Sequence, residues 1–470
     1  MKEKNTFGLI IGNRGFFPDV LVKEGREQII NFFENNGYNV ICLSTEDTKY
    51  GGVETLEDAI KCGKLFDENR NKIDGIIVTL PNFGDERAVA NSIKFSKLNV
   101  PVFIHAFKDN LKDMTLARRR DSFCGKISVC NNLYQYGIKY SLSENHTDNI
   151  DTNQFKNSIE WFAGVCRVVN KLRNARVGAI GARTGAFNTV RFSEKLLQQS
   201  GITTEVIDLA DFLNLVNKFT DTNKQVIDKL ESLKNYVRIN SNVSESSLIR
   251  MAKFGVALDN WVTEMKLDAI AIQCWTALQE IFGIVPCTLM SKLSETLLPS
   301  ACEVDIPGAL SMLALQEASN SPSAIVDWNN NFGEDQNKCV IFHCSNIPKS
   351  FFINPEMKIQ EIISQSVGNE NSAGACVGKL APGPITFCRI STDDIVGEIK
   401  AYVGEGEITN DVLDTFGGYG VVNINNLNQL LLYICEEGFE HHTAINKGQV
   451  SNIIFEAFTK YLEWDTYYHL

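Results

Sequence analysis

The sequence predicts an α/β protein: two parallel-sheet domains wrapped by helices, followed by a β-rich, barrel-like C-terminal domain. Three observations predict this class. Up to about residue 325, short apolar runs alternate with helical stretches, a pattern typical of parallel sheets covered by helices. Beyond that point the runs show β character and the turns are tighter, which favours antiparallel strands. With 470 residues the chain also exceeds what one hydrophobic core serves. We therefore expect domains at residues 1–172, 173–325 and 326–470.

The first domain is predicted to place polar side chains at the carboxyl ends of its strands. The expected strands are Thr6–Gly12, Tyr38–Leu43, Asp74–Leu80 and Val100–His105, with a helix at Val20–Asn36. Ligands of parallel sheets bind at those strand ends, where Arg14 and Asn82 suit a polyhydroxylated or anionic ligand. Capping or loop solvation is the open alternative for both residues. We interpret His105 as a hydrogen-bonded histidine of the sheet.

The second domain repeats this pattern, with strands expected at Arg176–Gly181, Thr204–Leu209 and Leu267–Gln273. Glycines after the first of these strands suggest phosphate or dinucleotide binding, but the G-x-G-x-x-G spacing is absent, so a tight turn is favoured. In the same loop, Arg183 remains a candidate substrate contact. Gln273 is expected to bind a sugar hydroxyl, and Trp275 to stack on an apolar sugar face.

Composition narrows the class of partner. The net charge is −12 and there are no basic runs, which argues against a nucleic-acid or anionic-membrane partner. No apolar run approaches the ~20 residues of a membrane-spanning helix. Thirteen cysteines without a C-x-x-C pair indicate free thiols in a reducing compartment. A cytoplasmic protein is therefore expected.

Two carboxylates bracket an apolar helical run. Glu303 lies before the expected helix, and Asp327 follows the short apolar run Ser323–Val326, which we interpret as a strand ending at that carboxylate. Asp305, just before Pro307, suits the capping position of the helix better than Glu303 does. Glu303 then lacks a simple structural role, which makes it a candidate for chemistry.

Three of the six histidines add nitrogen ligands to this pair. His343 closes an apolar run, and His441 and His442 stand together near the C-terminus. Two carboxylates with imidazoles form a ligand set that Mn²⁺ and comparable octahedral ions accept. Zinc would more often recruit cysteine, and no suitable Cys/His spacing exists. We therefore predict a divalent-metal site.

These residues resemble the L-fucose isomerase and L-arabinose isomerase superfamily. Fucose isomerases carry a Glu-x-Asp segment followed 24 positions later by an Asp, and Glu303 and Asp327 have that interval, with Gly308 and Met312 also fitting. His343 matches a metal-binding His of the arabinose isomerases. The Glu440-His441-His442-Thr443 segment resembles their C-terminal His-His-Thr.

The resemblance implies two Rossmann-like domains and a barrel-like third one, assembled as a homotrimer or homohexamer. It implies Mn²⁺, or Mg²⁺ or Co²⁺, held by Glu303, Asp327, His343 and one or both of His441 and His442. The implied activity is aldose–ketose isomerisation through an enediol, with Glu303 and Asp327 as catalytic residues.

The implied substrate contacts include Gln273 and Arg14, which in this family reaches a neighbouring subunit's active site. The implied substrate is a deoxy- or modified hexose or pentose, such as L-fucose, D-arabinose or L-arabinose. A sulfonated sugar such as sulfoquinovose, held by Arg14 or Arg183, is also open.

Two functions from other classes compete. Two Rossmann-like lobes also occur in non-catalytic sugar-binding proteins, so a cytoplasmic sugar-binding protein is the main alternative. A dinucleotide oxidoreductase built on Gly181–Gly185 would need the complete glycine fingerprint that the chain lacks.

Overall fold

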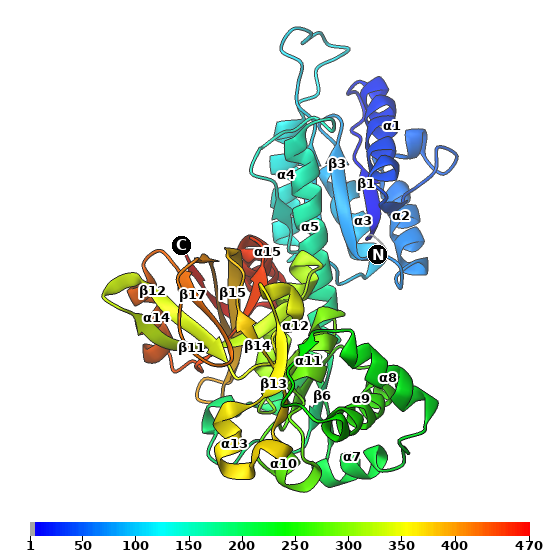
Figure 1. The fold of residues 1–470 in the computed structure, drawn as a ribbon. Helices are drawn as coiled ribbons and strands as arrows, with labels where there is room; N and C mark the ends of the chain where they lie inside the picture. Colours follow the sequence, from blue (N-terminus) through cyan, green and yellow to red (C-terminus); the bar gives the residue numbers. More distant parts are fainter. Residues whose placement is uncertain (1–4) are drawn as a thin grey trace. The chain divides into compact units, whose positions relative to one another are not determined.

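The structure, a computed structural model, describes residues 5–470 and forms two compact units, Met1–Asn170 and Lys171–Leu470 (Figure 1). Both units combine helices and strands, so the predicted α/β class is confirmed. Two of the three sheets are parallel, as predicted, and the third contains both strand directions. The division into three domains stays a prediction. Within residues 5–470, no helix has the length and apolar character that crossing a membrane requires.

The first unit is built on a five-stranded parallel sheet with the order β2-β1-β3-β4-β5. This is a doubly wound order, in which β1 and β3 flank the point where the strand order reverses. The strands are β1 Thr6–Ile11, β2 Asn39–Ile41, β3 Gly75–Leu80, β4 Val102–Ala106 and β5 Ser141–Leu142. The helices are α1 Asp19–Asn35, α2 Leu56–Glu68, α3 Glu86–Ser96, α4 Ser122–Gln135 and α5 Asn153–Leu172, with a 3-10 turn at Lys49–Gly51.

The central strands of this sheet are buried on both faces, because each face packs into its own core. Ile10, Ile76 and Val78 belong to one core. Leu9 and Ile77, one residue away along the same strands, belong to the other. Since successive side chains of a strand point to opposite faces, two covered faces require apolar residues throughout. This explains the continuous apolar runs in the sequence.

His105 lies in β4 and is fully enclosed in the first unit. Its Nδ1 lies 2.8 Å from the Thr79 hydroxyl, and its Nε2 lies 3.0 Å from the Asp148 carbonyl. Burial lowers the pKa of His105 to about 3, so the ring is neutral. The interpretation of His105 as a hydrogen-bonded structural histidine is confirmed.

The second unit contains a four-stranded parallel sheet with the order β10-β9-β6-β7. Its strands are β6 Arg176–Ile180, β7 Thr203–Ile207, β9 Ala269–Ile272 and β10 Ser300–Cys302. The helices around it are α6 Glu194–Gln199, α7 Leu209–Val216, α8 Lys224–Lys234, α9 Glu245–Met265, α10 Ala277–Phe282, α11 Cys287–Glu295 and α12 Ile306–Ser319, with a 3-10 turn η2 at Asn188–Val190.

A ten-stranded mixed sheet completes the second unit, with the order β19-β16-β15-β18-β11-β12-β17-β14-β13-β8. A further pairing joins β16 to β17. The strands are β8 Arg238–Ile239, β11 Ser323–Phe332, β12 Asp335–His343, β13 Glu356–Ile359, β14 Ala373–Lys379, β15 Gly383–Asp393, β16 Glu398–Ile408, β17 Gly418–Asn423, β18 His442–Lys447 and β19 Asp465–His469. Its helical segments are α13 Glu361–Val367, α14 Leu427–Glu436, α15 Ser451–Glu456 and a π-helical turn at Ala457–Leu462, with 3-10 turns at Lys349–Phe351 and Asn369–Asn371. The barrel-like form of this region stays a prediction.

One core connects the two sheets of the second unit. Ile272 of β9, Val326 of β11 and Ile445 of β18 belong to the same buried cluster. Helix α12 is buried from Ile306 to Ala318 and contacts strands of both sheets. The ends of α12 and of its neighbouring strands are therefore fixed against each other by packing.

The predicted cap of α12 is confirmed. Asp305 is the N-cap residue, and its Oδ1 accepts a 2.9 Å hydrogen bond from the Gly308 amide, with Pro307 in the first turn. A Cβ atom at Gly308 would lie 2.5 Å from Ile325 Cδ1 and 2.3 Å from Asp305 Oδ2. Glycine is therefore needed where α12 approaches β11.

One boundary expectation is wrong. Asp327 does not end its strand, because β11 continues to Phe332 and forms a hairpin with β12. The side chains of Asn329, Asn330 and Asn331 are exposed, which is why the apolar pattern stops although the strand pairing continues.

Candidate active site

Glu303 lies at the carboxyl end of the four-stranded parallel sheet. It follows β10 directly, and Cys274 and Trp275 follow the neighbouring strand β9. One carboxylate oxygen, Oε1, accepts a 2.9 Å hydrogen bond from Trp275 Nε1 and a 3.4 Å contact from the Cys274 thiol. The parallel sheet thus places Glu303 at the edge where ligands of α/β folds bind.

The backbone at Glu303 is held in an unfavourable conformation. Glu303 and Val304 have φ angles of 56° and 57°, in the left-handed region. A β-branched residue such as valine is rare there, and each such residue costs roughly 1–2 kcal/mol. Strain of this kind persists where surrounding structure fixes it, and it concentrates at functional sites. Here it occurs in the short segment between the end of β10 and the start of α12.

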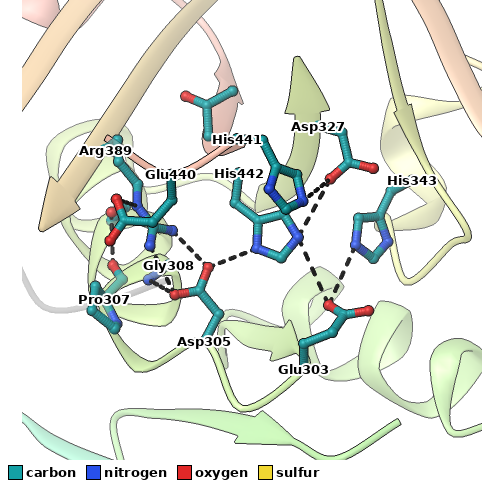
Figure 2. A network of polar contacts seen from close by, with 12 residues as sticks. Glu303, Asp305, Pro307, Gly308, Asp327, His343, Arg389, Glu440, His441 and His442 are labelled. Atoms are coloured by element: carbon teal, nitrogen blue, oxygen red, sulfur yellow. Dashed lines mark hydrogen bonds and ion pairs between the residues drawn. The ribbon is translucent and has the colours of Figure 1, made fainter. Parts of the chain in front are cut away.

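Asp327 and His442 meet through strand register. They are directly paired residues of the antiparallel strands β11 and β18, so their side chains lie on the same face of the sheet. His442 Nε2 lies 3.3 Å from Asp327 Oδ1 and 3.8 Å from Glu303 Oε2 (Figure 2). His442 is therefore the residue that faces both carboxylates.

Asp305 has a second task besides capping α12. Its Oδ2 accepts a 2.8 Å hydrogen bond from His442 Nδ1, which directs Nε2 toward Glu303 and Asp327. Arg389, fully buried in β15, donates two hydrogen bonds to Asp305, of 2.6 and 3.0 Å, and one of 3.0 Å to Glu440 (Figure 2). Two carboxylates thus compensate the buried guanidinium, and the network holds the imidazole in one orientation.

The electrostatics of the network follow from burial and pairing. Burial alone raises the pKa of Asp305, but the charge of Arg389 and the hydrogen bond from His442 bring it well below its usual range. Burial lowers the pKa of His442, and the hydrogen bond and charge of Asp305 outweigh burial, so that the pKa is raised. Burial raises the pKa of Glu303, while the imidazoles of His343 and His442 oppose the rise.

The donor atoms fit a divalent metal ion. Glu303 Oε2 and Asp327 Oδ1 are buried and have no hydrogen-bond partner within residues 5–470. Buried carboxylate oxygens left in this state are costly, and the two lie 3.8 and 3.3 Å from His442 Nε2. An ion between these three atoms would satisfy all of them, since oxygen and imidazole ligands suit Mn²⁺ and similar ions.

The other two histidines flank this set. His441 Nε2 lies 3.5 Å from Asp327 Oδ1, and its side chain is 39% exposed. His343 is buried, with its Nε2 3.9 Å from Glu303 Oε2. Ligand atoms of Asp327, His441 and His442 lie within 4.8 Å of one another, as do those of Glu303, His343 and Cys344. All five predicted metal-site residues are therefore neighbours.

An aromatic side chain that the sequence interpretation missed also borders the site. The ring of Phe187 lies 5.2 Å from that of His441, 5.8 Å from that of His442 and 5.9 Å from that of Trp275, between centroids. Phe187 belongs to the loop after β6, which also carries Arg183. An apolar residue in a glycine-containing loop gives no sequence signal that separates a site wall from loop packing.

Gln273 and Arg183 lie in the same unit as the metal-site residues and have local partners. Gln273 Oε1 accepts a 3.0 Å hydrogen bond from the Ala182 amide, which ties β9 to the loop after β6. Arg183 Nη1 donates 3.0 Å to Asn188 Oδ1 and contacts two backbone carbonyls of its own loop. Trp275, predicted to stack on sugar, also anchors Glu303 by its indole N–H.

Arg14 and Asn82 belong to the first unit, beside its strand-order switch. The Asn82 amide donates 2.8 Å to Asn13 Oδ1 and accepts from the Gly84 amide. Arg14 forms an ion pair with Glu86, and its guanidinium carbon lies 4.2 Å from the centre of the Phe83 ring. Both residues follow the carboxyl ends of strands, β1 and β3, as predicted for a parallel sheet.

Comparison with known proteins gives the family. The model of the fucose/sulfoquinovose isomerase N-terminal domain matches residues 8–173, and that of the L-fucose isomerase C-terminal domain matches residues 341–469. Sulfoquinovose isomerases of Priestia aryabhattai and Priestia megaterium are 24% identical over 463 residues, 97% of this chain and 97% of each relative. That of Alkalicoccus urumqiensis is 24% identical over 62% of this chain and 64% of its own length. The chain belongs to the fucose isomerase-like proteins and is an aldose–ketose isomerase.

Proposed function

We propose that this isomerase is metal-dependent, with Glu303, Asp327 and His442 holding Mn²⁺ or a comparable divalent ion such as Mg²⁺ or Co²⁺. One observation supports this most strongly. Two buried carboxylate oxygens without hydrogen-bond partners in the described chain converge on His442 Nε2, and Asp305 fixes the opposite nitrogen of that ring. A ligand orienter of this kind is typical of metal-binding histidines.

His442 is the better ligand of the histidine pair. His441 Nε2 lies 3.5 Å from Asp327 Oδ1, and its ring, 39% exposed, packs edge-on against Phe187. We assign His441 to the wall of the sugar pocket, within reach of the ion. His343 is assigned to the fourth ligand position beside Glu303, because its Nε2 is buried and faces Glu303 Oε2.

Glu303 and Asp327 are proposed to move the proton. When bound, the ion supplies Lewis acidity that makes the proton beside the sugar carbonyl easier to remove. One carboxylate takes that proton from the carbon next to the carbonyl, forming the enediol, and returns it to the former carbonyl carbon. The other carboxylate serves the proton exchange between the two oxygens. Trp275 holds the Glu303 carboxylate in place through Oε1.

The proposed substrate is a sulfonated hexose such as sulfoquinovose. The relatives that match nearly the whole chain carry that name. Arg183 supports the assignment, since the partners that its guanidinium has within residues 5–470 are uncharged oxygens, and its loop also carries Phe187 beside the histidines. An uncompensated guanidinium suits an anionic oxygen group.

The test is metal removal and add-back combined with a sugar panel. We expect purified protein treated with a chelator to lose isomerase activity and to regain it with Mn²⁺, and to prefer sulfoquinovose over glucose, L-fucose and L-arabinose. Glu303→Gln and Asp327→Asn should each lower kcat by about 10²–10⁴-fold, as expected for loss of an acid–base group. Glu334→Gln, in the exposed turn between β11 and β12, is the matched control.

Full activity in the chelated protein would contradict the metal assignment. Undiminished turnover by Glu303→Gln would contradict the proton-transfer role. Faster turnover of L-fucose or L-arabinose than of sulfoquinovose would overturn the substrate assignment and leave the isomerase chemistry intact.

A further inference from the structure

Four cysteines lie close together next to the candidate active site, each at one end of a different helix or strand. Cys274 follows β9, Cys302 ends β10, Cys344 follows β12 and Cys287 begins α11. Three of them are buried, and Cys344 is partly buried. The thiol of Cys302 interacts with the thiols of the other three. The proposed isomerisation uses none of these thiols.

Glu303 lies between these four cysteines and the proposed metal-site histidines. Its Oε1 faces the thiols, with Cys274 Sγ at 3.4 Å, whereas its Oε2 faces the imidazoles of His343 and His442. Single ligand atoms of Cys274, Cys302 and Glu303 lie within 4.8 Å of one another, and Cys344 lies within the same limit of Glu303 and His343. The carboxylate therefore borders a hard ligand set on one side and a soft one on the other.

The spacing of the cysteine sulfur atoms and the Glu303 carboxylate is close to that of a tetrahedral metal site. With Zn–S bonds of about 2.3 Å, the ligands of a tetrahedral zinc site lie roughly 3.8 Å apart. Cys274, Cys302 and Glu303 offer atoms within 4.8 Å of one another, so closure around one ion needs movements of about 1 Å there, within the reach of side-chain rotation. Cys344 shares that limit with Glu303 and His343, and its thiol interacts with that of Cys302, so its side chain can turn toward the same ion. Thiolates prefer zinc-like ions, whereas the oxygen and imidazole set suits Mn²⁺ and Mg²⁺.

We propose that Cys274, Cys302, Cys344 and Glu303 form a second metal site, selective for thiophilic divalent ions such as Zn²⁺ and Cd²⁺. Each thiol releases its proton to solvent when it binds the ion. Occupancy engages Glu303 as a ligand and removes it from proton transfer, so these ions inhibit the enzyme. The inhibition rests on the proposed function of Glu303, whereas the binding itself does not.

The structural alternative is that the thiols pack as small apolar side chains, which buried cysteines commonly do. A cadmium titration distinguishes a metal site from simple packing of the thiols. Reduced, chelator-treated full-length protein is titrated with Cd²⁺ in the presence of Mn²⁺, and the ultraviolet thiolate-to-Cd²⁺ charge-transfer absorption is recorded. We expect a band that saturates at one ion per chain. Cys302→Ser should lose it and Cys339→Ser should keep it, since Cys339 is a buried thiol of β12 outside the group.

Circular dichroism and thermal unfolding show whether each variant is folded. If Cys302→Ser does not fold, Cys344→Ser, at the partly buried position, carries the test. A band of unchanged intensity in a folded Cys302→Ser or Cys344→Ser variant, or no saturable band in the wild type, overturns the site. This absorption is independent of catalysis, so it stays informative if the isomerase proposal fails.

Inhibition is measured separately. With the Mn²⁺-loaded enzyme and sulfoquinovose, Zn²⁺ should inhibit the wild type and Cys339→Ser at concentrations at least tenfold lower than Cys302→Ser. Equal sensitivity of all three would show that Zn²⁺ acts by replacing Mn²⁺ at the catalytic ligands, and would overturn the inhibitory role.

Discussion

At the scale of single residues, Asp305 is the group on which the site's geometry depends. It caps α12, pairs with the buried Arg389 and holds His442, so three separate elements meet at one carboxylate. Removing one partner of a buried ion pair costs about 3–5 kcal/mol, because the remaining charge is left uncompensated. The same residue thus supports folding and the orientation of His442.

We expect Asp305→Asn to weaken Mn²⁺ binding by about 10–100-fold, the usual effect of removing a group that orients a metal ligand. The amide keeps the size and one oxygen of the side chain but loses the charge that fixes the His442 ring. Isothermal titration calorimetry with Mn²⁺ measures the affinity, and steady-state kinetics at saturating Mn²⁺ separates metal loss from a defect in turnover.

Asp208→Asn is the matched control for this substitution. Asp208 caps α7 through a 2.8 Å hydrogen bond to the Ala210 amide, and it is exposed. Loss of a cap alone should therefore leave Mn²⁺ affinity unchanged. If Asp305→Asn also binds Mn²⁺ with wild-type affinity while folded, Asp305 has structural roles alone, as the cap of α12 and the partner of Arg389.

Residue patterns singled out Glu303 and Asp327, whose carboxylates both lie beside His442, but they did not predict the full role of Asp305. The interval between the two carboxylates and the position of Pro307 are local signals, and both can be read from one chain. The capping pattern accounted for Asp305 completely, which concealed its contact with His442, 137 positions away. Arg389 gave one usable signal, since a charged residue inside an apolar strand requires a buried partner.

At the scale of elements, strand register and loop placement complete the site. Asp327 and His442 meet because they are paired in β11 and β18. Nothing in the sequence fixes which strands of a mixed ten-stranded sheet are neighbours, since that choice depends on long-range packing. The cluster of four cysteines could not be predicted from the sequence for the same reason, because its members come from four elements and form no short spacing motif.

The loop between β6 and η2 is expected to select the anionic group of the substrate. Arg183→Gln should raise KM for sulfoquinovose at least tenfold and leave KM for a neutral aldose unchanged, since only the charged contact is lost. Arg191→Gln, three residues beyond Asn188 on the same segment, is the control. An equal rise of KM for both sugars would mean that Arg183 shapes the loop without recognising the anion.

At the scale of the whole molecule, charge and unit organisation set further constraints. The net charge of −12 opposes approach of the proposed anionic sugar, so the proposal requires local cations that outweigh the long-range repulsion. Arg183 supplies one cation in the second unit, and Arg14 is the candidate in the first. Every proposed metal ligand lies within Lys171–Leu470. The proposed metal ligands and Arg14 therefore belong to different units.

We propose that the enzyme is a homo-oligomer in which Arg14 serves the active site of a neighbouring subunit, as the family resemblance implies. Arg14→Ala and Glu303→Gln should each be nearly inactive alone, since each removes a different part of every site. Mixed oligomers of the two variants should regain activity, because some sites then combine an intact Arg14 from one subunit with an intact Glu303 from another.

The measurement is sulfoquinovose turnover after the two variants are co-expressed with different tags and purified through both. Glu303→Gln co-expressed with wild type in the same way shows that mixed oligomers form and that intact sites work within them. If these controls are active and the Arg14→Ala/Glu303→Gln mixture is not, Arg14 acts within its own subunit. That outcome would contradict the exchange of Arg14 between subunits, and its ion pair with Glu86 would be a contact within its own unit.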